Sequence, residues 1–199
     1  MKIVRGGELR PIAWKNGRGT SRHLAVSPEA AGDDSFDWRV SCSEIAADSP
    51  FSQFADLDRQ ILLLRGRGFS LRCRDENVEF DRSVRQIDEP FAFRGEWETE
   101  CTLLAGPVAV LNVMTRRGRF GARVAPLALD AMRLVAKAAD EALVAYLVEG
   151  QATAYGRWGT ATLDAGDAVV VDERERTEIA LAPAGGGPAR FIEVRLSRT

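Results

Sequence analysis

The sequence consists of short apolar runs that Gly, Pro and Asp interrupt at the spacing expected of β-strands. Residues 60–71 and 145–155 share an outline in which an apolar run, a glycine turn and a second short run follow one another. Each block is followed by a turn and a further strand pattern that ends near acidic residues, at 91–96 and 163–173. Two such copies predict a duplicated β unit in an all-β chain, with strands stacked as a sandwich or barrel.

One stretch leaves its secondary structure open. Residues 127–142 are rich in Ala, Leu, Met, Lys and Glu, which favours a helix by intrinsic propensity. The apolar segments on either side of the polar residues 137–141 also fit two strands and a tight turn.

The charge balance restricts the class of partner. The 199 residues contain 27 Lys and Arg against 29 Asp and Glu, which gives a formal net charge of -2. Phosphate contacts need a basic surface, so we expect no nucleic-acid partner. The first residues form no apolar signal core, and no run of about 18 apolar residues occurs. We therefore expect a cytoplasmic protein without membrane contact.

Cysteine and histidine usage argues against several kinds of site. Cys42, Cys73 and Cys101 are odd in number and widely spaced, which indicates free thiols rather than a disulfide framework or a zinc site. His23 is the single histidine, whereas metal sites of the zinc and iron enzymes usually need several. We expect neither a metal nor another cofactor, and His23 fits a structural or surface role better than a ligand role.

Three polar segments in the first third of the chain are candidates for a site. Residues 13–24 combine an indole, an ammonium, an amide and two hydroxyls with glycines that permit turns; the order of a phosphate loop is absent, and a capped surface turn is the alternative. In residues 37–43, strand alternation puts Arg39, Ser41 and Ser43 on one face, which either lines a concave surface or is solvated. In residues 49–59, Asp58 and Arg59 are neighbours, so their side chains diverge in an extended segment.

These segments resemble a known family. Residues 14–22, 38–45, 50–68 and 106–118 are similar, in order and spacing, to successive motifs of the HutD/Ves family. The resemblance implies a bicupin, with a first cupin barrel at 1–117 that holds the ligand pocket and a second, mainly structural barrel at 118–199, with strands exchanged between the two left open. It also implies an association with bacterial histidine utilisation, without an established catalytic activity.

The family motifs carry over to individual positions. The ligand-binding residues that the resemblance implies are Trp14, Lys15, Asn16, Thr20, Trp38, Arg39, Ser41, Phe51, Ser52, Asp58, Arg59, Asn112, Met114 and Arg117. Two positions depart from the family pattern: Arg22 stands where a Glu is expected, and Val110 stands where an Asp is usual. If that Asp helps to hold a ligand, Val110 weakens the transfer of function.

Two functions follow from the residues and the resemblance. One is a regulatory, metal-free cupin that binds a small anionic metabolite such as urocanate or a formylglutamate-type acid. The other is a metal-independent isomerase or hydrolase with Asp58 or Glu44 as base and Lys15 or Arg39 stabilising negative charge. Binding is favoured over catalysis, and homodimer formation is left open.

Arg39 is the predicted anion anchor, because it shares a strand face with Ser41 and could fork onto a carboxylate. Arg59 is a weaker candidate, since a local carboxylate could occupy it. Pairing of Arg39 with an acidic residue of a neighbouring strand is the alternative.

Overall fold

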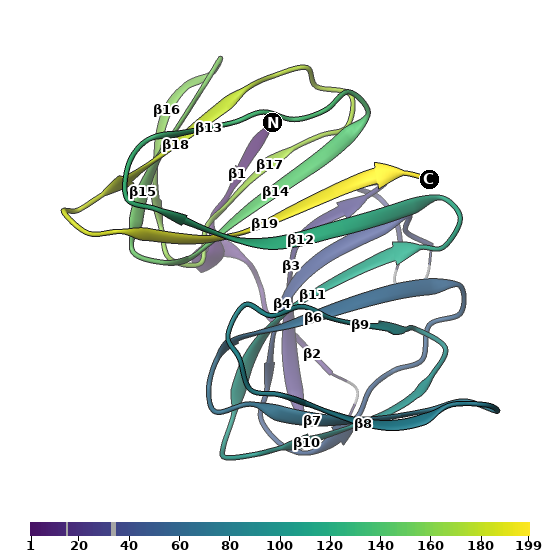
Figure 1. Cartoon of the computed structure of the whole chain (residues 1–199). Helices are drawn as coiled ribbons and strands as arrows, with labels where there is room; N and C mark the ends of the chain where they lie inside the picture. The colour runs from purple at the N-terminus through teal and green to yellow at the C-terminus, as the bar shows by residue number, and fades with distance from the viewer. Residues whose placement is uncertain (15, 33–34) are drawn as a thin grey trace. The chain divides into compact units, whose positions relative to one another are not determined.

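The protein consists of β-strands joined by turns, as Figure 1 shows for a computed structural model that describes residues 1–14, 16–32 and 35–199. The described residues include one short 3-10 helix, η1 (Gly6–Glu8). Two compact units are present, a first unit of residues 10–120 and a second unit of residues 1–9 and 121–199. Among the described residues, no helix is long and apolar enough to cross a membrane.

The first unit is a sandwich of two sheets. Its larger sheet has the order β2-β3-β4-β11-β6-β9, and its smaller sheet has the order β5-β10-β7-β8. The bounds are β2 (Ile12–Ala13), β3 (Gly19–Ser27), β4 (Trp38–Ile45), β5 (Ser49–Pro50), β6 (Leu57–Arg65), β7 (Phe69–Arg74), β8 (Glu79–Val84), β9 (Phe91–Arg94), β10 (Glu98–Leu103) and β11 (Val108–Arg116). Apolar side chains from both sheets, such as Ile61 and Val110 against Phe69 and Leu71, form one buried cluster between them.

The second unit is also a sandwich. Its sheets have the orders β1-β17-β14-β19-β12 and β13-β18-β15-β16. The bounds are β1 (Lys2–Val4), β12 (Phe120–Leu129), β13 (Arg133–Val135), β14 (Glu141–Glu149), β15 (Gln151–Gly156), β16 (Gly159–Asp164), β17 (Ala168–Val171), β18 (Ile179–Ala184) and β19 (Ala189–Arg198). Leu143 and Phe191 of one sheet pack in a single buried cluster with Ala154 and Leu181 of the other.

The strand order repeats between the units, as the two similar sequence blocks predict. β4-β11-β6-β9 of the first unit corresponds to β12-β19-β14-β17 of the second, and β5-β10-β7-β8 corresponds to β13-β18-β15-β16. Two glycines hold equivalent turns: Gly66 follows β6 with φ +109°, and Gly150 follows β14 with φ +83°. A Cβ on Gly66 would lie 2.9 Å from the carbonyl oxygen of Pro107, and one on Gly150 would lie 2.5 Å from that of Pro188. Each glycine therefore permits both the turn and a close backbone approach.

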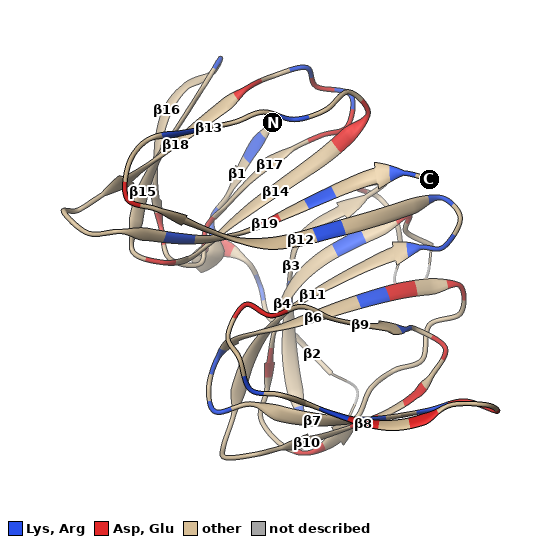
Figure 2. Ribbon diagram, in the orientation of Figure 1, with Lys and Arg blue, Asp and Glu red and all other residues tan. Residues whose placement is uncertain are grey.

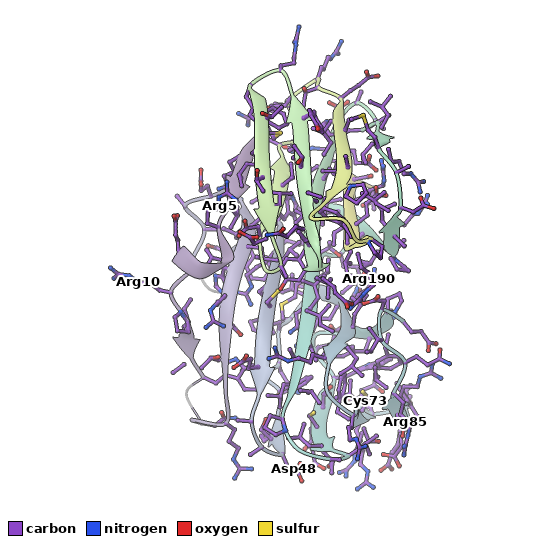
Figure 3. The ribbon with its side chains drawn as sticks, turned by 90° about the vertical axis from the view of Figure 1, so that its left-hand side faces the viewer. Arg5, Arg10, Asp48, Cys73, Arg85 and Arg190 are labelled. Carbon is purple, nitrogen blue, oxygen red and sulfur yellow. The ribbon has the colours of Figure 1, made fainter. Side chains whose placement is uncertain are left out.

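The N-terminal residues belong to the second unit, which differs from the expected division into 1–117 and 118–199. β1 pairs with β17 in antiparallel register, with Ile3 opposite Val169. Arg5, labelled in Figure 3, donates to the carboxylate of Asp167 at 2.6 Å. Asp167 also accepts the backbone N–H of Gly6 at 2.9 Å. This long-range pairing fixes the start of the chain on the second sandwich.

The stretch left open by the sequence forms strands, not a helix. Residues 127–129 end β12, and β13 and β14 follow with a turn at 139–140 between them. β13 and β14 do not form the hairpin that a tight turn suggests, because β13 pairs with β18 and β14 pairs with β17 and β19. Pairing in two different sheets thus overrides the helix propensity of this segment.

Candidate functional site

Two arginines on different strands of the larger sheet face the interior of the first sandwich. One strand lies between them. Met114 on β11 is opposite Arg39 on β4 and opposite Arg59 on β6. Side chains alternate along a strand, so Arg59 shares the face of Ile61, which lies in the buried cluster between the sheets. Figure 2 shows one acidic and one basic band side by side on β6. The basic residue of that pair is turned inward.

Arg59 carries its charge into the interior, and no carboxylate of the described residues pairs with it. The residue is only 6% exposed, its Nη1 donates to the carbonyl oxygen of Ser52 at 3.2 Å, and its Nε has no hydrogen-bond partner among the described residues. Burial, and then the nearby charge of Arg39, lower the pKa of Arg59 to about 9. No carboxylate within the described part of the chain forms a salt bridge with Arg59 or raises this pKa.

Aromatic rings surround the Arg59 guanidinium. Its Cζ lies 4.7 Å from the ring centroid of Phe93, 5.3 Å from that of Phe51 and 5.7 Å from that of Phe54. The ring faces attract a cation and restrict where the side chain can lie, but they do not neutralise its charge. Arg59 is therefore held in place and remains a strong electrostatic attractor for an anion.

Arg39 lies beside this group on the same sheet face. It is 8% exposed, its Cζ lies 4.4 Å from the Phe36 ring centroid, and its Nη2 donates to the sulfur of Met114 at 3.5 Å. Phe54 is shared by both arginines, at 5.6 Å from the Cζ of Arg39. The two guanidinium groups thus occupy one aromatic-walled region of the interior.

A chain of neutral polar groups continues along the same face. Asn112 is opposite Ser41, and both are buried, at 7% and 5% exposure. The Nδ2 of Asn112 donates to Ser43 Oγ at 3.3 Å, and the hydroxyls of Ser43 and Ser21 are 2.8 Å apart. The indole Nε1 of Trp14 donates to Ser21 Oγ at 2.8 Å. Hydroxyl and amide groups therefore occupy the next inward-facing positions along the strands after the arginines.

Asp58 and Arg117 do not join this interior. Arg117 donates to Asp58 Oδ1 at 3.0 Å and forms two hydrogen bonds with the Glu96 carboxylate, at 2.7 Å and 3.0 Å. These bonds raise the pKa of Arg117 and lower that of Glu96. Asp58 and Arg59 diverge, as their adjacency predicts. The prediction that a local carboxylate could occupy Arg59 is wrong, because the neighbouring carboxylate turns away to Arg117.

The remaining predicted residues divide between the interior and the surface. Asn16 is exposed and its Oδ1 accepts the backbone N–H of Arg18 at 3.0 Å, which is the capped surface turn considered as the alternative. By strand alternation, Trp38 and Thr20 lie on the other face of the sheet from the arginines. Thr20 pairs across the strands with Glu44. Ser52 contributes its backbone carbonyl to Arg59. Lys15 lies outside the described residues.

The sequence motifs did not indicate several of the interior groups. Ser21, Phe36 and Phe93 touch the arginines or the hydroxyl chain, although none was assigned a ligand role. The alternation of side chains on β3 could have identified Ser21. It lies two residues before His23, and the two residues are the cross-strand partners of Ser43 and Ser41. Val110, one of the departures from the family pattern, is fully buried in the apolar cluster.

The interior groups do not suit a divalent metal ion. Two guanidinium groups repel a cation, and hydroxyl and amide groups replace the imidazole and carboxylate ligands that zinc or iron prefers. Within the ranges that the structure describes, no group of three or more His, Cys, Asp or Glu is placed to hold a metal. The donor set fits an anion instead.

Sequence comparisons identify relatives of this chain. The family model HutD matches residues 7–187. Protein Ves of Citrobacter koseri is 37% identical over 112 residues, which is 56% of this chain and 56% of that relative, so the match spans little more than half of Ves. A 21.2 kDa protein encoded in the hutC 3' region of Pseudomonas putida is 31% identical over 124 residues, covering 62% of this chain and 63% of that protein.

Solved structures give the same relationship at the level of the fold. The conserved protein PA5104 of Pseudomonas aeruginosa PAO1 has a TM-score of 0.85 at 26% identity, covering 98% of each chain. HutD of Pseudomonas fluorescens SBW25, in its formate condition, has a TM-score of 0.78 at 25% identity, covering 100% of this chain and 98% of that one. Oxalate decarboxylase of Lactobacillus farciminis, at 11% identity and a TM-score of 0.73, shows a cupin-type fold alone.

Proposed function

The chain belongs to the HutD family, and we propose that it binds a small carboxylate in the interior of its first sandwich, in a regulatory role in histidine utilisation. The observation that carries the proposal is Arg59, a buried guanidinium with no carboxylate partner among the described residues. Burial of a charge without a partner lowers the free energy of unfolding by several kcal/mol. A bound anion would supply the missing partner.

The surrounding groups define the ligand class. Two guanidinium groups can take one carboxylate each or share one by forked hydrogen bonds. The rings of Phe51 and Phe54 would contact an apolar or planar part of the ligand. The hydroxyl of Ser41 and the amide of Asn112 would form hydrogen bonds with a second polar group of the ligand. Urocanate and formylglutamate-type acids have this chemistry.

The relatives support this choice of pathway. The Pseudomonas putida relative is encoded in the hutC 3' region, and the Pseudomonas fluorescens relative is named HutD.

The enzyme alternative has less support from the geometry. Its proposed bases are engaged elsewhere, since Asp58 pairs with Arg117 at 3.0 Å and Glu44 pairs with Arg65 at 3.3 Å. Both carboxylates have strand positions on the face opposite to that of Arg59 and Arg39. A binding protein requires no base beside the arginines, and the proposal follows that reading.

Calorimetric titration with urocanate, N-formylglutamate and formate tests the proposal. We expect at least one of these acids to bind the wild type, and Arg59→Gln to weaken that binding about tenfold or more, which is about 1.4 kcal/mol. Arg65→Gln is the matched control, because the Arg65 side chain is 78% exposed, and its affinity should equal that of the wild type.

Two results would contradict the proposal. One is that none of the three acids binds the wild type at millimolar concentration. The other is that Arg59→Gln, shown to be folded by circular dichroism, binds the acid as tightly as Arg65→Gln does.

A further inference from the structure

A cavity of about 320 Å³ lies in the second unit, apart from the site just described. Charged residues line much of it, namely Arg123, Arg133, Glu141, Glu193 and Arg195, together with the apolar residues Leu134, Val135, Ala136 and Ala138. Its size is at the lower end of the range of small-molecule sites, about 300 to 1,000 Å³. It was not expected, because the second barrel was predicted to be mainly structural.

The strand order places two of the lining arginines at sheet edges. In the first unit, β2 and β3 extend the larger sheet beyond β4. The corresponding strand of the second unit, β12, ends its sheet, and β13 ends the facing sheet. Arg123 on β12 and Arg133 on β13 thus come from two sheet edges. The cavity is therefore lined both by these two edge strands and by Glu141 of β14 and Arg195 of β19, which lie inside the larger sheet.

The base of the cavity holds one arginine in a fixed orientation. Arg195 Nε donates to Glu193 at 2.7 Å, and its Nη1 donates to Glu141 at 2.8 Å. Glu141 is itself 8% exposed and also accepts the backbone N–H of Ala138 at 3.2 Å. These bonds leave Nη2 of Arg195 as a donor that makes no hydrogen bond with the described residues. A guanidinium held in this way loses little entropy when it binds a ligand.

The rim adds two further guanidinium groups. Arg123 and Arg133 are exposed, and neither forms an ion pair with a residue that the structure describes. Three arginines against two glutamates leave the lining with one net positive charge. Arg195 balances one of the two glutamate charges, and Arg123 and Arg133 outweigh the other, so the net charge that a ligand meets is positive.

We propose that this cavity is a second binding site, which holds a small organic anion with one or two carboxylate groups through Arg123, Arg133 and Nη2 of Arg195. The carboxylates would receive forked hydrogen bonds from the rim arginines while Arg195 fixes their position from below. The site is independent of Arg59 and does not rest on the function proposed for the first sandwich.

Glutarate, a flexible dicarboxylate, is a suitable probe in a ¹H–¹⁵N NMR titration of the full chain. We expect saturable shifts of the backbone amides of residues 133–138. Arg123→Gln/Arg133→Gln should weaken this binding about tenfold or more, while Arg59→Gln should leave it unchanged. The double variant Arg65→Gln/Arg67→Gln removes two other exposed charges and should also leave it unchanged.

Five outcomes would overturn the proposal. These are the absence of saturable shifts at residues 133–138, equal shifts with sodium chloride at matched ionic strength, and unchanged affinity in Arg123→Gln/Arg133→Gln. The fourth is that an acidic peptide shifts the amides of 132–135 while glutarate does not, which would indicate strand docking at the β13 edge. Loss of glutarate binding in Arg59→Gln would assign the response to the first sandwich and would also contradict the proposal.

Discussion

The two sandwiches share a strand order but differ in whether an inward-facing arginine is paired with carboxylates. In the second, Arg195 is opposite Leu143 on β14 and is paired with Glu141 and Glu193. In the first, the equivalent strands bring Met114 opposite Arg59, and no described carboxylate pairs with Arg59. Hydrogen bonding to the carboxylates raises the pKa of Arg195, whereas burial lowers that of Arg59.

This contrast separates an arginine whose charge the fold itself balances from one whose charge it leaves unbalanced. An inward arginine with its own carboxylates has its charge balanced within the fold, as Arg195 does, although its Nη2 stays available as a donor. An inward arginine held only by rings and a carbonyl oxygen makes the ligand-free fold less stable than it could be. Proteins tolerate such a cost at functional sites, where stability and activity often conflict.

Removing the carboxylates of the second sandwich should have the largest effect. Glu141→Gln/Glu193→Gln leaves Arg195 in the condition of Arg59, and we expect a loss of about 3 to 5 kcal/mol in the free energy of unfolding. Urea denaturation measures it. Glu149→Gln, on the same strand but with a side chain 74% exposed, is the control and should change stability by less than about 0.5 kcal/mol. Equal effects of the two variants would remove the contrast between the sandwiches.

The pH dependence of stability gives a smaller test of the first sandwich. The pKa of Arg59 is about 9 in the folded chain, below its ordinary value of 12.5, so the unfolded chain binds more protons between these values. Stability therefore rises with pH in this window, by up to about 1.4 kcal/mol per pH unit above 9. We expect Arg59→Met to have a higher free energy of unfolding than the wild type at pH 9. This difference should become smaller by about 1 to 2 kcal/mol between pH 9 and pH 10.5. A constant difference would mean that Arg59 keeps its proton up to pH 10.5, against a pKa of about 9.

Local patterns predicted the strands and their faces. Alternation correctly placed Arg39, Ser41 and Ser43 together, and the two similar blocks anticipated the repeated strand order. Adjacency alone showed that Asp58 and Arg59 diverge. Each of these conclusions depends on residues within a few positions of one another, where strand geometry is decisive.

Contacts between distant residues could not be predicted in the same way. Asp58 pairs with Arg117, 59 positions away, and this pairing is what leaves Arg59 without its neighbour's carboxylate. β1 joins β17 across most of the chain, so a division of the sequence at residue 117 did not place the N-terminal residues, although an exchange of strands between the units was left open. The cavity at Arg123 and Arg133 arises from two sheet edges, which no sequence motif marks.

The stability of ligand-free Arg59→Met tests the central claim most directly. Methionine fills much of the same space without charge, so urea unfolding at pH 7 should show a gain of about 1 to 4 kcal/mol over the wild type, together with loss of carboxylate binding. A loss of about 3 to 5 kcal/mol, as expected when one partner of a buried ion pair is removed, would show that Arg59 serves the fold and would contradict its role as the anion anchor.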